Sequence, residues 1–205
     1  MSDFDKVAAD WDKNQMHIDR SEAIAQKLLP FLKGKKNGSA MEFGAGTGLL
    51  SFLLKDKFNK IVLLDSSHEM VNTANAKISQ SGSNHMQAVF FDLEKKDYPT
   101  EPFDVIFTQM VLHHVEDIDL ICKKFYNLLQ PGGILAIADL YSEDGTFHSE
   151  GFTGHYGFEP DDIREKLLYA GFAKVVYENC YTITKEVSDG KIKDFPIFLL
   201  VAERD

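Results

Sequence analysis

The sequence predicts an α/β fold: a doubly wound, mostly parallel sheet with helices on both faces. Short apolar runs alternate with segments whose apolar residues recur at helical spacing, which indicates repeated strand–helix units. Continuous apolar runs such as residues 61–64 fit parallel strands that are covered on both faces. Acids and glycines follow several of these runs, so we expect them to gather at the carboxyl edge of the sheet, where such folds bind ligands.

Composition excludes several classes of protein. The 205 residues suit a single domain, with 44% hydrophobic and 26% charged residues. A net charge of −10 disfavours nucleic acid as a partner, because phosphate contacts need clustered Lys and Arg. No apolar run approaches the ~20 residues of a membrane helix, and the first residues lack the pattern of a secretion signal. We therefore expect a cytoplasmic protein without a membrane partner, with Cys122 and Cys180 as reduced buried thiols and no metal site.

The N-terminal part is predicted to be a helical cap, residues 1–36, in front of a core formed by residues 37–205. Its helix is expected over about 21–32, with Ser21 as the N-cap and Ile24 and Leu28 on the buried face. Pro30 is expected to distort the last turn of this helix.

The core elements follow from apolar runs and from residues that interrupt them. Strands are predicted at 39–43, 60–65, 86–91, 103–109, 134–140, 172–185 and 195–202. Helices are predicted at 47–57, after residue 65, at 117–129 and at 160–170. Pro160 suits a first helical turn and Gly171 a C-cap. The last two strands are expected to pair as an antiparallel hairpin, and residues 141–158, which have no clear period, to form a loop over the site.

A glycine-rich turn follows the first core strand. Glu42 ends that strand, and Gly44, Gly46 and Gly48 follow in the pattern E-x-G-x-G-x-G. Glycine has no Cβ, so the backbone of such a turn can approach a ligand closely. A dinucleotide fingerprint would need glycine at position 49, where this chain has Leu49. The alternative is a tight strand-to-helix turn that binds nothing.

Two aspartates follow the next two strands. Asp65 comes 17 residues after Gly48, close to the spacing of ~20 at which an acid binds ribose hydroxyls in nucleoside-binding α/β folds. Asp92 closes the third strand. Each could instead be a solvated strand-end residue or a turn residue, because Asp favours such positions.

An ordered series of short motifs extends over about residues 39–172. The motifs are the glycine pattern, D-x-S-x-x-M at 65–70, Phe91-Asp92-Leu93, the strand 103–109, Leu112-His113-His114-Val115 and L-x-P-G-G at 129–133. Together they resemble the class I S-adenosylmethionine (SAM)-dependent methyltransferases, of the small-molecule type found in the ubiquinone/menaquinone biosynthesis-like superfamily.

The resemblance implies a three-layer Rossmann-like sandwich. Its seven-stranded, mostly parallel sheet would have the order 3-2-1-4-5-7-6, with strand 7 antiparallel. It also implies SAM as cofactor, S-adenosylhomocysteine as product, and in-line displacement of the methyl group by a small-molecule acceptor. The rival interpretations are a non-catalytic SAM-binding protein and an NAD-dependent oxidoreductase, the second disfavoured by Leu49. The acceptor and the oligomeric state stay open.

The resemblance also assigns cofactor contacts. Glu42 would lie near the ammonium group of SAM, Asp65 would bind ribose, Asp92 would bind the adenine amino group, and Gln109 would lie beside the sulfonium. Met70 would pack on adenine or serve the core. The implied cofactor-binding residues are Glu42, Gly44, Ala45, Gly46, Gly48, Asp65, Ser66, Met70, Asp92, Leu93 and Gln109.

No catalytic residue is assigned, because a base is needed only if the acceptor must lose a proton. The candidates for that proton transfer are His113, His114, His148, His155 and Tyr141. The N-terminal segment and residues 141–158 are the expected lids, with Trp11 as a possible cover for the cofactor. Aromatic residues that could line an acceptor pocket, or pack in the core, are Phe147, Phe152, Tyr156 and Phe158.

Overall fold

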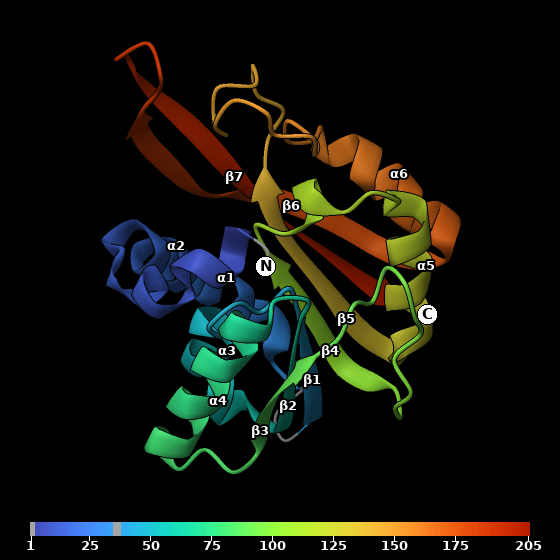
Figure 1. The fold of residues 1–205 in the computed structure, drawn as a ribbon. Helices are drawn as coiled ribbons and strands as arrows, with labels where there is room; N and C mark the ends of the chain where they lie inside the picture. The colour runs from blue at the N-terminus through green and yellow to red at the C-terminus, as the bar shows by residue number, and fades with distance from the viewer. Residues whose placement is uncertain (1–2, 35–37) are drawn as a thin grey trace.

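A twisted central sheet organises the computed structural model, which describes residues 3–34 and 38–205 (Figure 1). Within those residues its seven strands are β1 (Gly38–Phe43), β2 (Phe58–Asp65), β3 (Met86–Phe90), β4 (Phe103–Gln109), β5 (Leu129–Leu140), β6 (Phe172–Glu186) and β7 (Ile192–Arg204). Their order is β3-β2-β1-β4-β5-β7-β6, and β7 runs antiparallel to both neighbours. The predicted fold class and strand order are confirmed.

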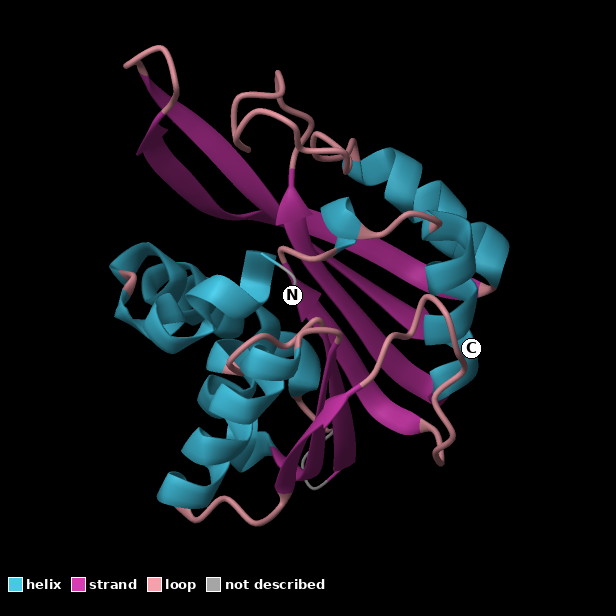
Figure 2. Cartoon of the chain, in the orientation of Figure 1, coloured by secondary structure: helices cyan, strands magenta, loops and turns pink. Residues whose placement is uncertain are grey.

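Helices cover both faces of the sheet (Figure 2). In the described part of the chain the α-helices are α1 (Asp3–Val7), α2 (Gln15–Leu28), α3 (Leu49–Leu54), α4 (His68–Ser81), α5 (Ile118–Leu128) and α6 (Pro160–Ala170). Short 3-10 turns are η1 (Ala8–Lys13), η2 (Leu29–Leu32), η3 (Lys55–Lys57) and η4 (Leu112–His114). One face packs against α2, α3 and α4, and the other against α5 and α6, which gives three layers.

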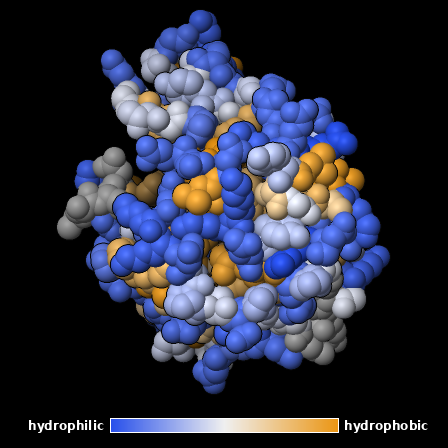
Figure 3. Space-filling model, turned by 90° about the vertical axis from the view of Figure 1, so that its right-hand side faces the viewer, coloured by the Kyte–Doolittle hydropathy of each residue, from blue (hydrophilic) through white to orange (hydrophobic). Residues whose placement is uncertain are grey.

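The two hydrophobic layers follow from the alternation of side chains along each strand. In β1, Ala40 belongs to the layer under α2–α4, whereas Met41 belongs to the layer under α5 and α6. Ile61 and Val62 of β2 divide in the same way. Consecutive apolar residues are therefore buried on opposite faces, as expected for a parallel sheet covered on both sides. The outer surface over α5 and α6 is mostly hydrophilic, with hydrophobic patches between the hydrophilic residues (Figure 3).

The N-terminal helix differs from its prediction. α2 begins at Gln15, where the side chain of Asn14 accepts a hydrogen bond from the amide of Met16. Ser21 is therefore inside the helix, and its hydroxyl donates to the carbonyl of His17 instead of capping. The polar residues after Asn14 hid this start, because the apolar period becomes visible only further along. The predicted boundary between residues 36 and 37 lies outside the described residues.

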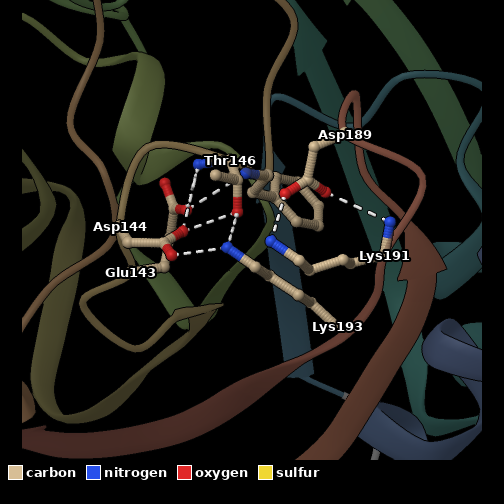
Figure 4. A network of polar contacts seen from close by, with 7 residues as sticks. Glu143, Asp144, Thr146, Asp189, Lys191 and Lys193 are labelled. Carbon is tan, nitrogen blue, oxygen red and sulfur yellow. Dashed lines mark hydrogen bonds and ion pairs between the residues drawn. The ribbon is translucent and has the colours of Figure 1, made fainter.

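The β6–β7 hairpin extends past the carboxyl edge of its neighbours, toward the segment that follows β5 (Figure 1). Polar contacts join the two (Figure 4): Lys193 Nζ lies 2.6 Å from Asp144 Oδ2 and 3.1 Å from Thr146 Oγ1. Lys185 Nζ also donates to the carbonyl of Phe147 at 2.6 Å. The hairpin thus supports the loop over residues 141–158. Across residues 3–34 and 38–205, no helix has both the length and the apolar character needed to cross a bilayer.

Candidate functional site

A cavity of about 360 Å³ lies at the carboxyl edge of the sheet, where the strand order reverses between β1 and β4. This is the position at which open α/β sheets bind ligands, and the volume is within the range of ligand pockets. Three groups of residues form the wall: the turns after β1, β2, β3 and β4, the N-terminal segment, and the loop after β5. Segments far apart in the sequence therefore meet around one space.

The glycine turn has the conformation that only glycine adopts readily. The φ angles of Gly44, Gly46 and Gly48 are +64°, +54° and +81°. A Cβ on Gly44 would lie 2.4 Å from a methyl carbon of Val111, and a Cβ on Gly48 would lie 2.5 Å from Leu63 Cδ2. At Gly46 such a Cβ would meet only the sulfur of Met70, at 3.8 Å. Two glycines are thus required by packing, and the third leaves the cavity open.

Asp65 holds this turn in place. One carboxylate oxygen accepts from the amide of Gly46 at 2.7 Å, and the other accepts from the amide of Ser67 at 2.7 Å. Burial raises the pKa of Asp65, and the bonds from Ser67 and Gly46 oppose that rise. Asp65 therefore lies behind the cavity wall, with both oxygens directed at main chain.

Glu42 is fully buried beneath the turn. Its Oε2 accepts from the amide and the hydroxyl of Ser51, in the first turn of α3, and its Oε1 has no hydrogen-bond partner among the described residues. Burial raises the pKa of Glu42 to about 8, against the opposing effect of the Ser51 bonds. Glu42 thus ties β1 to α3 and does not reach the cavity wall.

Most of the residues predicted to bind cofactor line the cavity. They are Gly44, Ala45, Gly46, Ser66, Met70, Asp92, Leu93 and Gln109. Glu42, Gly48 and Asp65 lie behind this wall, where they shape the turn. Oε1 of Gln109 lies 3.1 Å from the hydroxyl oxygen of Ser21 on α2, and this contact joins the N-terminal helix to the end of β4.

A histidine cluster forms the opposite part of the wall. Asp139, at the end of β5, lies with Oδ1 2.6 Å from His113 Nδ1 and also accepts from the His113 amide. Burial acts to raise the pKa of Asp139, but the charge and hydrogen bonds of His113 outweigh it and the pKa is lowered. Burial, followed by the charge of His113, lowers the pKa of His114 and His148 to about 4. These two imidazoles are therefore neutral at pH 7.

Two other candidates for proton transfer lie outside the cavity wall. His155 has its Nε2 3.0 Å from the carbonyl of Val115 and borders neighbouring surface hollows instead. Tyr141 packs its ring edge-on against Phe198, and burial raises its pKa. His113, His114 and His148 are the candidates that the structure brings together.

Aromatic rings from both predicted lids lie at the cavity, on either side of His114. From the N-terminal segment, Phe4 lies edge-on to His114 at 5.2 Å, and Trp11 lies over His17 at 4.1 Å. From the loop after β5, the ring of His148 stacks on Phe152 at 3.7 Å. Of the four aromatic residues predicted for the acceptor pocket, Phe147 lines the cavity, Phe152 and Tyr156 lie outside it and Phe158 is in the core under α5 and α6.

The N-terminal segment is clamped onto the glycine turn and α4. Asp12 pairs with Lys77 at 2.5 Å and accepts from the hydroxyl of Thr47. Lys77 also donates to the carbonyl of Thr47, and Asp5 accepts from the hydroxyl of Ser67 at 2.6 Å. These contacts position Phe4 and Trp11 over the cavity.

The wall residues on α2 were not predicted from the sequence: Met16, His17 and Arg20. They precede the predicted start of this helix. A signal was present, because Met16, Arg20, Ile24 and Leu28 recur at four-residue intervals. Arg20 is the charged member of this otherwise apolar series, so the spacing places its side chain on the buried face of α2.

The sheet order, its reversed strand and the cavity beside a glycine turn define the class I methyltransferase fold. The family described as "Methyltransferase domain" matches residues 41–137. An uncharacterised methyltransferase of Schizosaccharomyces pombe is 33% identical over 147 residues, which are 63% of this chain and 51% of that protein. Phosphoethanolamine N-methyltransferase 3 of Arabidopsis thaliana is 27% identical over 162 residues, which are 75% of this chain and 32% of that protein. The chain thus spans about half, or less, of these relatives.

Solved structures agree on the fold. Phosphoethanolamine N-methyltransferase 2 of Haemonchus contortus, in complex with SAM, has a TM-score of 0.71 at 18% identity, covering all of this chain and 60% of that one. A SAM-dependent methyltransferase of Aquifex aeolicus has a TM-score of 0.63 at 22% identity, covering 88% and 89%. The chain thus has the fold of the class I SAM-dependent methyltransferases, and its residues 41–137 are similar to the methyltransferase domain family.

Proposed function

We propose that this chain is a SAM-dependent methyltransferase that transfers the methyl group to a small-molecule acceptor by in-line displacement. The observation that carries the proposal is one cavity whose wall joins the glycine turn after β1 to the histidine and aromatic cluster after β4 and β5. A cofactor and an acceptor can therefore lie in contact, shielded from water. The small-molecule assignment is supported by relatives named for phosphoethanolamine.

The wall on the β1–β3 side fits SAM. The backbone of Gly44, Ala45 and Gly46 would support the methionine end, in a cradle that a Cβ on Gly44 would disrupt. Asp92 and Leu93 would bind the adenine, and Met70 lies beside Gly46 to pack against it. Ser66 would contribute a polar contact beside Asp65. Bound SAM supplies a methyl group on a positively charged sulfur, whose departure leaves a neutral thioether.

The protein's own contribution is mainly position. Gln109, held by Ser21, would orient the reacting groups at the end of β4. Phe4, Trp11 and Phe147 would exclude water from above. For an acceptor that must lose a proton, His114 and His148 in the wall are unprotonated and can accept it, but as weak bases, because burial lowers the pKa of each to about 4. His113, bonded to Asp139, would orient its neighbours.

The domain organisation follows the same proposal. Residues 1–36 would act as a helical cap over the cofactor, and residues 37–205 as the Rossmann-like core. Residues 141–158 would close the acceptor side, because Phe147 and His148 of this segment line the cavity. We propose that the protein works without nucleic acid or membrane and in the cytoplasm, in line with its acidic composition.

Calorimetric titration with SAM, S-adenosylhomocysteine and NAD tests the proposal. We expect micromolar binding of the first two and no binding of NAD. Incubation with methyl-labelled SAM and a panel of small metabolites should then give a labelled product. Binding of NAD alone would overturn the proposal, and SAM binding without transfer to any acceptor, including protein and RNA, would favour the non-catalytic alternative.

A further inference from the structure

Arg20 is a buried cation in the cavity wall. It lies on α2, is 5% exposed and is one of the residues that line the cavity. Within the described part of the chain, its Nε is buried without a hydrogen-bond partner, and the partner of its Nη1 is the sulfur of Met16, at 3.9 Å. Among residues 3–34 and 38–205 no carboxylate lies within ion-pair distance of it. Arg20 thus presents hydrogen-bond donors that the protein leaves unused.

This arrangement is unfavourable unless a ligand completes it. Burial lowers the pKa of Arg20 to about 10, so the group keeps its charge at neutral pH. The electrostatic effects of Asp139 and Tyr181 raise the pKa of Arg20, against the effect of burial. The carboxylate of Asp139, however, is already hydrogen-bonded to His113. A buried charge normally pairs with an opposite charge, because it has lost its hydration. The other two arginines differ from Arg20: Arg164 is exposed and pairs with Asp161, and Arg204, whose Nε is also buried without a partner among the described residues, donates through Nη1 to the carbonyls of Tyr126 and Leu129.

The position of Arg20 separates it from the contacts predicted for adenine. Asp139 belongs to β5 and Tyr181 to β6, so Arg20 faces that half of the sheet. Met70 and Asp92 follow β2 and β3, on the other side of β1 and β4. The neighbouring wall residues on the Arg20 side include Phe147 and His148 from the loop after β5. This part of the cavity combines one cation with aromatic surface.

We propose that Arg20 binds an anionic group, a carboxylate or a phosphate, on the methyl acceptor. This inference rests on the proposed function and adds the chemical class of its acceptor: a small acid with a flat apolar body. A guanidinium offers a planar fork of donors that matches both kinds of oxyanion in a bidentate manner. The aromatic rings around Phe147 would hold the body of the molecule.

The test compares full-length wild type with R20M, which removes the charge at similar volume, and with R164M, the same change on the surface. Binding of benzoate, phenyl phosphate and the neutral benzamide to each protein saturated with S-adenosylhomocysteine is measured by calorimetry. We expect benzoate or phenyl phosphate to bind wild type and R164M at least tenfold more tightly than benzamide, and R20M to lose this preference. The tighter of the two anions distinguishes a carboxylate from a phosphate.

The competing explanation is that Arg20 binds the carboxylate of the cofactor's own methionine end. Affinities of R20M for S-adenosylhomocysteine and for 5′-methylthioadenosine, which lacks that end, decide this. A tenfold loss for the first alone would overturn the inference, as would an anion preference that survives in R20M. Failure of wild type to bind S-adenosylhomocysteine would instead refute the proposed function. A melting temperature of R20M equal to or above wild type shows that the variant folds.

Discussion

The two halves of the cavity are built in different ways. On the β1–β3 side, consecutive residues form the wall and the supporting polar groups are paired with main chain, as Asp65 is with Gly46 and Ser67. On the β5–β7 side, single side chains come from α2, η4 and the loop after β5, and Arg20 is left unpaired. The first half is a fixed backbone cradle for a constant ligand. The second half consists of single side chains from separate elements, so these residues can differ between proteins that share the cradle.

Removing the carboxylate of Asp139 should have the largest effect, and it tests the assembled half. Asp139→Ala leaves the buried His113 without its partner, and losing one member of a buried pair typically costs about 3–5 kcal/mol. Urea denaturation would measure the loss. Asp139→Asn keeps an acceptor for His113 and should retain more stability, and the exposed Asp161→Ala should change it by less than about 1 kcal/mol.

The pH dependence of the same pair has a definite sign. The pKa of Asp139 is lower in the folded protein than in the unfolded chain, where it is about 4. The ionised carboxylate therefore stabilises the fold above pH 4, and this stabilisation is lost as the pH falls through the pKa of the folded state. Wild type should therefore lose stability below pH 4 more steeply than Asp139→Asn. If the stability of wild type and of Asp139→Asn falls equally below pH 4, the carboxylate of Asp139 is not ionised in the folded protein.

Gly44→Ala tests the fixed half. The new Cβ would clash with Val111, and alanine is strained at φ +64°, so we expect a loss of about 2–4 kcal/mol in folding and a large loss of SAM affinity. Gly82→Ala is the matched control, because its φ is +66° and nothing lies within 4 Å of a Cβ there. Adding Val111→Ala should restore part of the loss. Without any recovery, the clash is not the cause.

A moderate effect is expected at Glu42, beneath the cradle. Its pKa is raised to about 8, so the folded state holds a proton that the unfolded state releases above about pH 4.5. Stability should therefore fall as the pH rises from 5 to 8. Glu42→Gln, which can still accept from Ser51, should flatten this dependence in denaturation curves between pH 5 and 9. A wild-type curve that is already flat over this range would contradict the buried, protonated state.

The smallest effect concerns the support of the loop after β5. Lys193→Ala removes the exposed contacts with Asp144 and Thr146, and such pairs contribute about 0–1 kcal/mol. We expect an unchanged melting temperature but faster hydrogen exchange over residues 142–158. Lys191→Ala, which loses only the local pair with Asp189 at the hairpin tip, is the control. Equal exchange in both variants would mean that the hairpin does not hold the loop.

Prediction from sequence succeeded where the pattern is local. Apolar runs located the strands, and the glycines located the turn, because each is encoded by neighbouring residues. The orientation of Glu42 and Asp65 was harder to predict, since an acid at a strand end can face a ligand or the amides of its own turn. Arg20 and His17 were missed because capping by Asn14 starts α2 a turn and a half before the apolar period is evident. Their meeting with Phe147 depends on tertiary packing.

The ion pair between Asp12 and Lys77 has a kinetic consequence. Both side chains are about two-thirds or more covered, yet they remain in contact with solvent, so dissolved ions can weaken their attraction. Since this pair fastens Trp11 above the bound molecules, product departure should require its temporary rupture. If rupture of the ion pair limits the rate of turnover, turnover should be faster at moderate ionic strength than at low ionic strength. The same screening should slightly weaken the attachment of the N-terminal segment when no ligand is bound.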